Sequence, residues 1–147
     1  MEIRKAVPSD MRFIITEGIK FMEYHPLSYK KDIDPKELIL LADKIIKEHI
    51  ILIAEKDGKQ IGVIAGVVAP NPFNSKYLGL AEIMWWVKEE YRGSSAALKL
   101  LHAFEKAGKE RGVDYMTMVR TMYTPELDKV YKKRGYIPAE TTFLKEL

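Results

Sequence analysis

The sequence predicts an α+β fold with a mixed central sheet. Runs with the apolar spacing of strands and helices follow one another in the order β-α-α-β-β-β-α-β-α-β. The dipeptide Asp57-Gly58 separates two strand-like runs and is a strong hairpin signal, so part of the sheet is antiparallel. Helical stretches separate other strands, which indicates crossover connections. Hairpins mixed with crossovers exclude a doubly wound sheet.

Length and composition fit one globular domain over residues 1–147. The hydrophobic content of 47% is that of an ordinary folded protein and excludes a disordered chain. The chain has no cysteine, which excludes disulfides and thiolate metal sites.

The sequence favours neither secretion nor a membrane span. The start, MEIRKAVPSD, lacks the apolar run of a secretory signal, and no apolar segment is long enough to cross a bilayer. We therefore expect a cytoplasmic protein with no membrane partner. The net charge of +3 does not favour nucleic acid as a partner, although it leaves room for a local anionic ligand.

The N-terminal third predicts one strand and two helices. Residues 2–7 form a short β-prone run, and Ser9 or Asp10 then offers an N-cap. Pro26 breaks the first helix, and Asp34 with Pro35 begins the second. The apolar positions with helical spacing in the first helix are Met11, Ile14, Ile15, Gly18, Ile19 and Met22. The expected buried stripe of the second helix consists of Leu38, Leu41, Ala42, Ile45 and Ile46.

Three long strands occupy the middle of the chain. Two of them lie within residues 49–70 on either side of the Asp57-Gly58 turn, and the third is LAEIMWWV, residues 80–87. A helix follows, with Leu100, Leu101 and Phe104 on one face, and it ends at Gly112.

The last third predicts another strand, a short helix and a closing β segment. VDYMTMVR, residues 113–120, has strand character. Thr124 is the expected cap of the next helix, and Gly135 is its expected terminator. Residues 136–147 are expected to close the chain as one or two strands.

The turn before the long helix has the composition of an anion site. Helix starts leave backbone N–H groups without partners and carry a partial positive charge. Gly93 permits close approach of the backbone, and Arg92 adds a permanent charge. These features predict a phosphate or diphosphate ligand. A plain helix start capped by Ser94 or Ser95 fits the spacing equally well. The Walker and dinucleotide patterns do not fit, because their glycines and lysine are missing.

The stretch VKEEYRGSSAALKLL resembles the acyl-CoA motif of the GNAT superfamily of N-acetyltransferases. That motif reads Arg/Gln-x-x-Gly-x-Gly/Ala, usually after Val-x-x-x-Tyr/His-Arg-Gly. Arg92, Gly93 and Ala97 match it, and Ser95 stands where glycine is usual. VYKKRGY, residues 130–136, is similar to the second family signature, and the two together are more specific than either alone. The Trp-Trp-Val run resembles a phage-type branch of the superfamily.

The resemblance implies a GNAT fold, in which the sheet splays between its fourth and fifth strands and carries helices on both faces. It also implies acetyl-CoA as acyl donor, without a metal. Main-chain amides of the turn before the long helix would bind the CoA diphosphate, and the pantetheine arm would pair with the free edge of the preceding strand. The residues concerned are Arg92, Gly93, Ser94, Ser95, Ala96 and Ala97 in the turn, Trp85, Trp86 and Val87 in the strand, and Tyr131.

Two residues are candidates for the chemistry. Tyr131 matches the family tyrosine that protonates the departing thiolate, although it also fits simple packing of the last helix. Glu82 is a candidate general base. Alternatively, Glu82 is an ordinary solvent-exposed glutamate, and ordered water removes the proton from the amine. Strand alternation predicts Glu82 on the same face as Met84 and Trp86, opposite Ala81, Ile83 and Trp85.

The expected reaction is acetyl transfer to a primary amine by direct attack in a ternary complex. The sequence does not identify the amine-bearing acceptor. It is also compatible with either a monomer or a homodimer. The alternative is a non-catalytic GNAT-fold module that binds CoA or a macromolecular partner. His25, His49 and His102 lack the spacing of metal ligands, so no metal is expected.

Overall fold

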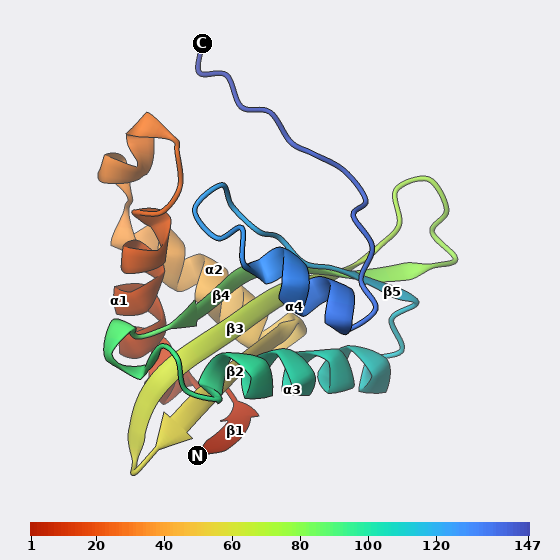
Figure 1. The fold of residues 1–147 in the computed structure, drawn as a ribbon. Helices are drawn as coiled ribbons and strands as arrows, with labels where there is room; N and C mark the ends of the chain where they lie inside the picture. Colours follow the sequence, from red (N-terminus) through yellow and green to blue (C-terminus); the bar gives the residue numbers. More distant parts are fainter.

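The computed structural model describes the backbone of residues 1–147 and every side chain except those of Tyr29 and Lys30. One sheet with the strand order β1-β2-β3-β4-β5 lies at its centre (Figure 1). The strands are β1 (Glu2–Lys5), β2 (Ile50–Lys56), β3 (Lys59–Pro70), β4 (Leu78–Val87) and β5 (Tyr115–Thr117). The helices are α1 (Met11–Met22), α2 (Pro35–Glu48), α3 (Ala96–Glu110) and α4 (Leu127–Lys133), with short 3-10 turns η1 (Pro8–Asp10), η2 (Ser28–Asp32) and η3 (Glu89–Tyr91).

The sheet is mixed, which confirms the predicted fold class. The pairs β1–β2, β2–β3 and β3–β4 are antiparallel, whereas β5 runs parallel to β4. The hairpin between β2 and β3 turns at Asp57 and Gly58, whose φ angles of 51° and 72° are both positive. Such angles are those of a type I′ turn, which matches the twist of the strands that it joins.

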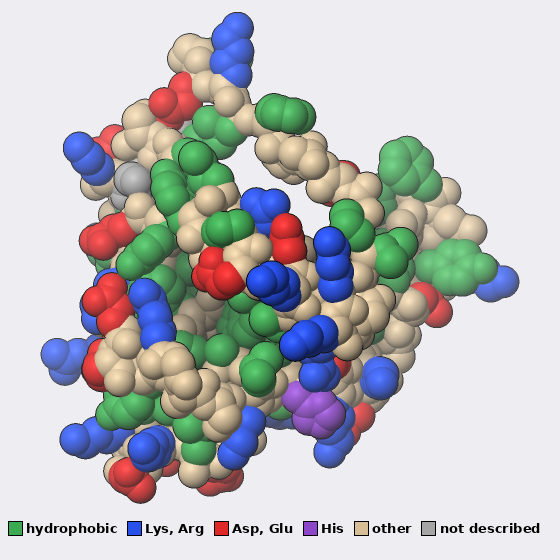
Figure 2. Space-filling view, viewed as in Figure 1, with side chains coloured by type: hydrophobic (Ala, Val, Ile, Leu, Met, Phe, Trp, Pro, Cys, Tyr) green, Lys and Arg blue, Asp and Glu red, His purple; other side chains and the backbone are tan. Residues whose placement is uncertain are grey.

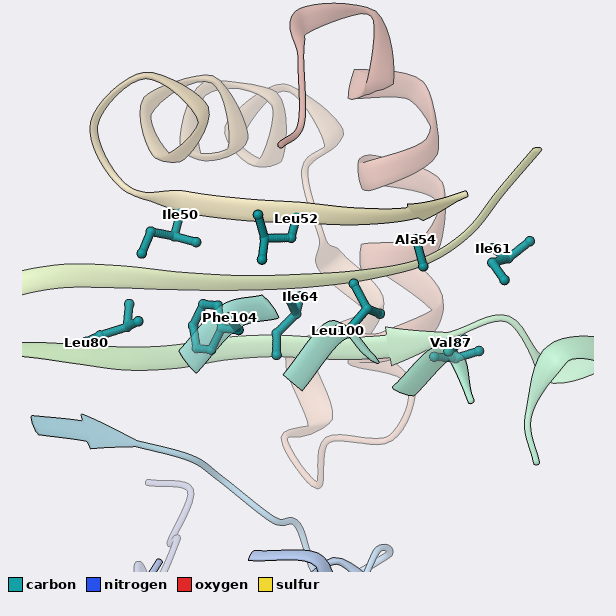
Figure 3. Close-up of a cluster of buried hydrophobic side chains, with 10 residues drawn as sticks. Ile50, Leu52, Ala54, Ile61, Ile64, Leu80, Val87, Leu100 and Phe104 are labelled. Carbon is teal, nitrogen blue, oxygen red and sulfur yellow. The ribbon is translucent and has the colours of Figure 1, made fainter. Parts of the chain in front are cut away.

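Helices cover both faces of the sheet (Figure 1). On one face α3 packs its apolar side on β2, β3 and β4, and Figure 3 shows the buried side chains between them. Phe104 and Leu100 of α3 are fully buried there. Gly66 of β3 makes room for α3, because a Cβ at this position would lie 2.5 Å from the Phe104 ring. On the other face α1 and α2 cover a second buried cluster around Ile53, Val63 and Trp86.

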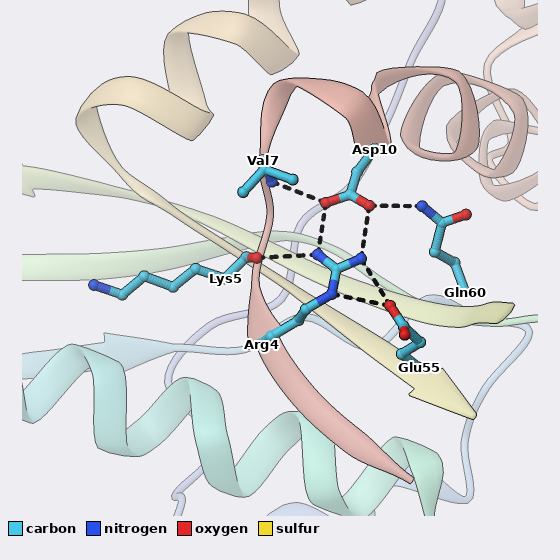
Figure 4. Close-up of polar contacts among 6 residues, drawn as sticks. All are labelled: Arg4, Lys5, Val7, Asp10, Glu55 and Gln60. Carbon is cyan, nitrogen blue, oxygen red and sulfur yellow. Dashed lines mark hydrogen bonds and ion pairs between the residues drawn. The ribbon is translucent and has the colours of Figure 1, made fainter. Parts of the chain in front are cut away.

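A polar network ties the start of α1 to the edge of the sheet (Figure 4). The Arg4 guanidinium donates to both carboxylate oxygens of Asp10, at 2.8 and 2.9 Å, and also pairs with Glu55 of β2. The Val7 amide and the Gln60 side chain also donate to Asp10, at 2.8 and 2.6 Å. Four donors therefore compensate the burial of this carboxylate, which is 1% exposed.

The helix caps follow the sequence prediction in part. Asp34 caps α2 as predicted, because its carboxylate accepts the Lys36 amide at 2.8 Å. Asp10 precedes α1, but its carboxylate accepts from the Val7 amide and from Arg4, so it does not cap α1. Thr124 does not cap α4, which begins three residues later with no side-chain cap. Leu41 was predicted to be buried and is 48% exposed.

The chain after α4 forms no strand, so the prediction of one or two strands in residues 136–147 is wrong. A strand needs a neighbour for its backbone hydrogen bonds, and this segment stands away from the body of the protein (Figure 2). Ile137 and Phe143 are 84% and 92% exposed. The segment is attached near its end, where the Glu146 carboxylate accepts from the amide and hydroxyl of Ser28. β5 is also shorter than predicted. No helix in the described part of the chain has the length and apolarity that crossing a membrane requires.

Candidate active site

The candidate site lies along the half of β4 that has only one neighbouring strand. β4 pairs with β3 along its whole length, but it pairs with β5 only from Gly79 to Ala81. Beyond that point the chain after β5 leaves the sheet, so in the described structure residues 82–87 have no strand partner on this side. The sheet is therefore open between its fourth and fifth strands, and this opening leaves main-chain groups of β4 free to pair with a ligand.

The register identifies which groups face the open edge. The Lys88 amide donates to the Ile61 carbonyl of β3 at 2.9 Å. In an antiparallel ladder the residues that bond to the neighbour alternate with residues that point the other way. Trp86 therefore bonds to β3, and Trp85 and Val87 direct their N–H and C=O groups toward the open edge. The Val87 carbonyl accepts from Arg92 Nε at 3.1 Å, which leaves the Trp85 peptide groups and the Val87 amide.

The turn between β4 and α3 presents further free amides. The amides of Arg92 and Ser94 donate to the carbonyls of Glu89 and Tyr91, at 3.1 and 3.3 Å. The Ala96 amide donates to Ser94 Oγ at 3.3 Å, and the Ala96 side chain is fully buried. Among the described residues, the amides of Gly93, Ser95 and Ala97 have no acceptor. Three free amides at the start of a helix form a site suited to an anion.

Gly93 gives this turn its shape. Its φ of +83° lies in the left-handed region, which residues with a Cβ rarely adopt. A Cβ built on Gly93 would meet no atom within 4 Å, so the turn is open on that side. The Ser94 hydroxyl donates back to the Tyr91 carbonyl at 2.7 Å and does not fill the opening. The backbone can therefore approach a bound group closely here.

The Arg92 side chain lies on the α1 side of the turn. Its guanidinium is stacked 4.4 Å from the centre of the Trp86 ring, and its Nε holds the Val87 carbonyl. The sequence predicted Arg92 as a charge beside the anion. In the structure Arg92 Nε donates to the Val87 carbonyl and the Arg92 amide donates to the Glu89 carbonyl, so any contact with an anion comes from the two terminal guanidinium nitrogens.

A β-bulge decides where Glu82 points. Met84 pairs with Ala65, and Glu82 pairs with Gly66, so Ile83 is an extra residue without an opposite partner. Paired residues share a face of the sheet, and Gly66 faces α3. Glu82 therefore lies on the α3 and α4 face with Trp85. The predicted alternation, which placed Glu82 with Met84 and Trp86, is wrong because it assumed a strand without a bulge.

Glu82 is a buried carboxylate with one backbone donor. It is 7% exposed, and its Oε2 accepts the Val119 amide at 3.0 Å. Burial raises the pKa of Glu82 to about 7, and the Val119 amide opposes this shift only in part. A carboxyl group that changes charge near neutral pH can take up and release protons under ordinary conditions.

Tyr131 of α4 reaches the same backbone segment. Its hydroxyl donates to the Val119 carbonyl at 2.8 Å, and its ring lies 6.2 Å from that of Trp85. Burial, and secondly the charge of Glu82, raise the pKa of Tyr131 well above its ordinary value, so its hydroxyl stays protonated at neutral pH. An ion pair between Arg134 and Glu105 ties the end of α4 to α3, and the Tyr136 hydroxyl donates to the same carboxylate at 3.1 Å.

The structure thus brings together most of the residues that the sequence predicts for the site. Trp85, Glu82 and Tyr131 gather on one face beside the open edge, and the turn at Gly93 lies beyond the end of the same strand. Figure 2 shows a hollow on this side of the molecule, with lysine and arginine side chains gathered over α4. Trp86 faces away from this group, toward α1. In the described part of the chain, no three His, Cys, Asp or Glu side chains come together in a way that would hold a metal ion.

Sequence reasoning missed Val119 and Glu17. Val119 contributes only backbone groups, for which the sequence carries no signal. Glu17 is 3% exposed and binds the Trp86 indole N–H at 2.8 Å. A signal for Glu17 did exist, because it lies three residues after the buried Ile14 and four before Phe21, on the inner side of a predicted helix.

Comparisons with known proteins agree with this architecture. The sequence profile of the family described as acetyltransferase (GNAT) matches residues 19–136. No curated protein sequence matches the chain.

Solved structures with the same fold cover nearly all of the chain. A predicted acetyltransferase with acetyl-CoA from Clostridium acetobutylicum is 18% identical, with a TM-score of 0.74 over 99% of this chain and 95% of that one. An aminoglycoside N-acetyltransferase in complex with CoA is 16% identical, with a TM-score of 0.73 over 99% and 93%. A ribosomal-protein-alanine N-acetyltransferase from Brucella melitensis biovar Abortus 2308 is 13% identical, with a TM-score of 0.73 over 100% of both chains.

Proposed function

The chain belongs to the GNAT acetyltransferase family, and we propose that it moves an acetyl group from acetyl-CoA to a primary amine by direct attack in a ternary complex. The observation that carries the proposal is the position of Glu82 on β4 and of Tyr131 on α4, both beside the open edge of the strand that leads into the free amides around Gly93. The open edge of β4 thus runs from two groups able to move protons to an anion site.

The free groups of the chain fit the donor. The amides of Gly93, Ser95 and Ala97 lack acceptors in the described structure and are suited to a diphosphate. The Trp85 peptide groups and the Val87 amide offer bonds to an extended arm with amide groups, as a further strand would. The buried Trp85 indole nitrogen has no partner among the described residues, so this region also holds an unused donor.

When bound, acetyl-CoA supplies the acetyl group as an activated thioester. The acceptor must attack as a neutral amine, and Glu82 with a pKa of about 7 takes the proton that the nitrogen loses. As the C–N bond forms and the C–S bond breaks, Tyr131 gives its hydroxyl proton to the departing sulfur. To do so, the hydroxyl must turn from the Val119 carbonyl toward the open edge.

The donor and the reaction have separate tests. Calorimetric titration with CoA should give saturable binding, and thiol release from acetyl-CoA should rise when a suitable amine from a library of primary amines is added. Absence of CoA binding at high protein concentration would reject the proposal. CoA binding without thiol release for any amine would favour the other function considered from the sequence, a non-catalytic module.

A further inference from the structure

Glu17 is a buried carboxylate that the proposed chemistry does not use. It lies on α1, is 3% exposed, and both of its oxygens are bonded. Oε2 accepts the Trp86 indole N–H at 2.8 Å, and Oε1 accepts Lys20 Nζ at 2.9 Å. Burial of a carboxylate is unfavourable unless such bonds compensate it, so this residue constrains the groups that it holds.

Trp86 is the group that Glu17 orients. The bond from its indole nitrogen fixes the rotation of the ring within the α1 side of the core. Phe21 of α1 packs on it edge-on at 6.3 Å between ring centres, and Tyr24 packs at 5.4 Å. The Arg92 guanidinium stacks on the same ring at 4.4 Å. The indole is thus a platform that α1 positions and that Arg92 rests on.

Arg92 passes this constraint to the start of the turn. Its Nε donates to the Val87 carbonyl at 3.1 Å, and the next residue is Gly93. A second tie runs parallel to the first, because the Tyr24 hydroxyl donates to Glu89 at 3.3 Å, and Glu89 lies 3.9 Å from Arg92. Helix α1 and the turn after it therefore hold the β4–α3 turn from the face opposite Glu82 and Tyr131.

We infer that Glu17 is a positioning residue for the amides of the β4–α3 turn, acting through Trp86 and Arg92. This inference rests on the proposed function only in taking those amides as the diphosphate site. Loss of the Glu17–Trp86 bond leaves a buried N–H without an acceptor and frees the ring to tilt. The turn then samples other arrangements, and its affinity for the diphosphate falls. Ligand contacts made by other parts of β4 keep their strength.

Three variants separate this role from simple packing. Glu17→Met keeps the length of the side chain and removes the acceptor. Glu17→Gln retains an oxygen for the indole and loses the ion pair. Lys20→Met removes the same ion pair from the other side and leaves the Glu17–Trp86 bond intact. Ile45→Val on α2 serves as a control for destabilisation of the α1 and α2 layer, since Ile45 is buried in the same cluster as Trp86.

The first measurement needs no ligand. Hydrogen exchange of the amides in residues 92–97 should be several-fold faster in Glu17→Met than in the wild type, with Glu17→Gln, Lys20→Met and Ile45→Val close to the wild type. The second compares two ligands. Glu17→Met should weaken CoA affinity about three- to tenfold, and the KM for S-acetylpantetheine, which lacks the diphosphate, should stay the same.

The exchange rates and the two ligands together test the positioning role of Glu17. Unchanged exchange and unchanged CoA affinity in Glu17→Met would overturn the inference, as would equal losses for CoA and S-acetylpantetheine. Faster exchange in Ile45→Val to the same degree would assign the effect to general loosening and would also overturn it. If the wild type binds no CoA, the proposed function fails, and the exchange comparison still decides whether Glu17 positions the turn.

Discussion

Glu82 and Tyr131 bind the two sides of one residue, Val119. The carboxylate accepts the Val119 amide at 3.0 Å, and the phenol donates to the Val119 carbonyl at 2.8 Å. The segment that leaves β5 thus separates two titratable side chains that come from β4 and α4. This arrangement keeps both groups buried and gives each a defined hydrogen-bond partner, and it places the proposed base and the proposed acid beside the open edge.

Replacement of Glu82 by glutamine tests the general base. Glu82→Gln keeps an oxygen for the Val119 amide and removes the site that accepts a proton. We expect kcat/KM for the acceptor amine to fall by about 10²- to 10⁴-fold, the usual contribution of a general base. The affinity for CoA should not change, because the diphosphate site is distant along β4. A variant with wild-type turnover would show that water performs this step.

The pH dependence of stability offers a second test of the same residue. The folded pKa of Glu82, about 7, lies above its ordinary value of 4.5, so the folded protein binds the proton more tightly than the unfolded chain does. Stability from this group is complete below pH 4.5 and is lost as pH rises through 7, by about 3 kcal/mol at most. Denaturant unfolding at pH 5 and pH 8 should show this loss in the wild type and a smaller one in Glu82→Gln. Equal losses in both proteins would contradict the assigned pKa.

Removal of the Tyr131 hydroxyl tests the proposed acid. Tyr131→Phe leaves the ring against Trp85 and takes the donor from the Val119 carbonyl. We expect kcat to fall by about 10²-fold and stability to fall by about 1 kcal/mol. Acyl donors with more acidic thiols should recover much of the lost rate, because such a leaving group needs no proton. A rate that stays at the wild-type level would return Tyr131 to a packing role.

Substitution of Gly93 tests the diphosphate turn, and the hairpin supplies a matched control. Gly93 and Gly58 have φ angles of +83° and +72°, and a Cβ at either would meet no atom within 4 Å. Valine at either position should therefore strain the backbone by about the same 1–2 kcal/mol. Gly93→Val should abolish CoA binding in a calorimetric titration, whereas Gly58→Val should keep wild-type affinity. Similar affinities in the two variants would show that the turn is only a helix start.

The network around Asp10 predicts a loss of stability in acid. Hydrogen bonds from Arg4 first, and then from Val7 and Gln60, hold the pKa of Asp10 at about 2, below its ordinary 3.8. Stability from this group is complete above pH 3.8 and is lost as pH falls through 2. The loss should be about 1–2 kcal/mol, since Arg4 is partly exposed to solvent. Denaturant unfolding at pH 2 and pH 5 should show it, and Asp10→Asn should show a smaller difference.

Local signals in the sequence predicted much of the fold. Asp57-Gly58 specified a hairpin, Asp34-Pro35 started α2, and Gly112 and Gly135 ended α3 and α4, because each of these depends on the conformation of a few adjacent residues. The β-prone residues 136–147 gave the wrong prediction. Their backbone has no neighbouring strand to bond with, and β propensity alone supplies none.

For the site, the sequence by itself determined the glycine turn after β4 and the residue types of Glu82 and Tyr131. The tertiary structure decided how these residues meet. The bulge at Ile83 turns Glu82 to the face of Trp85, and the departure of the chain after Thr117 opens the edge of β4. The burial that raises the pKa of Glu82 comes from segments far away in the chain. A sequence pattern reports the period of a single element, whereas the register between strands and the packing of distant segments arise only when the chain has folded.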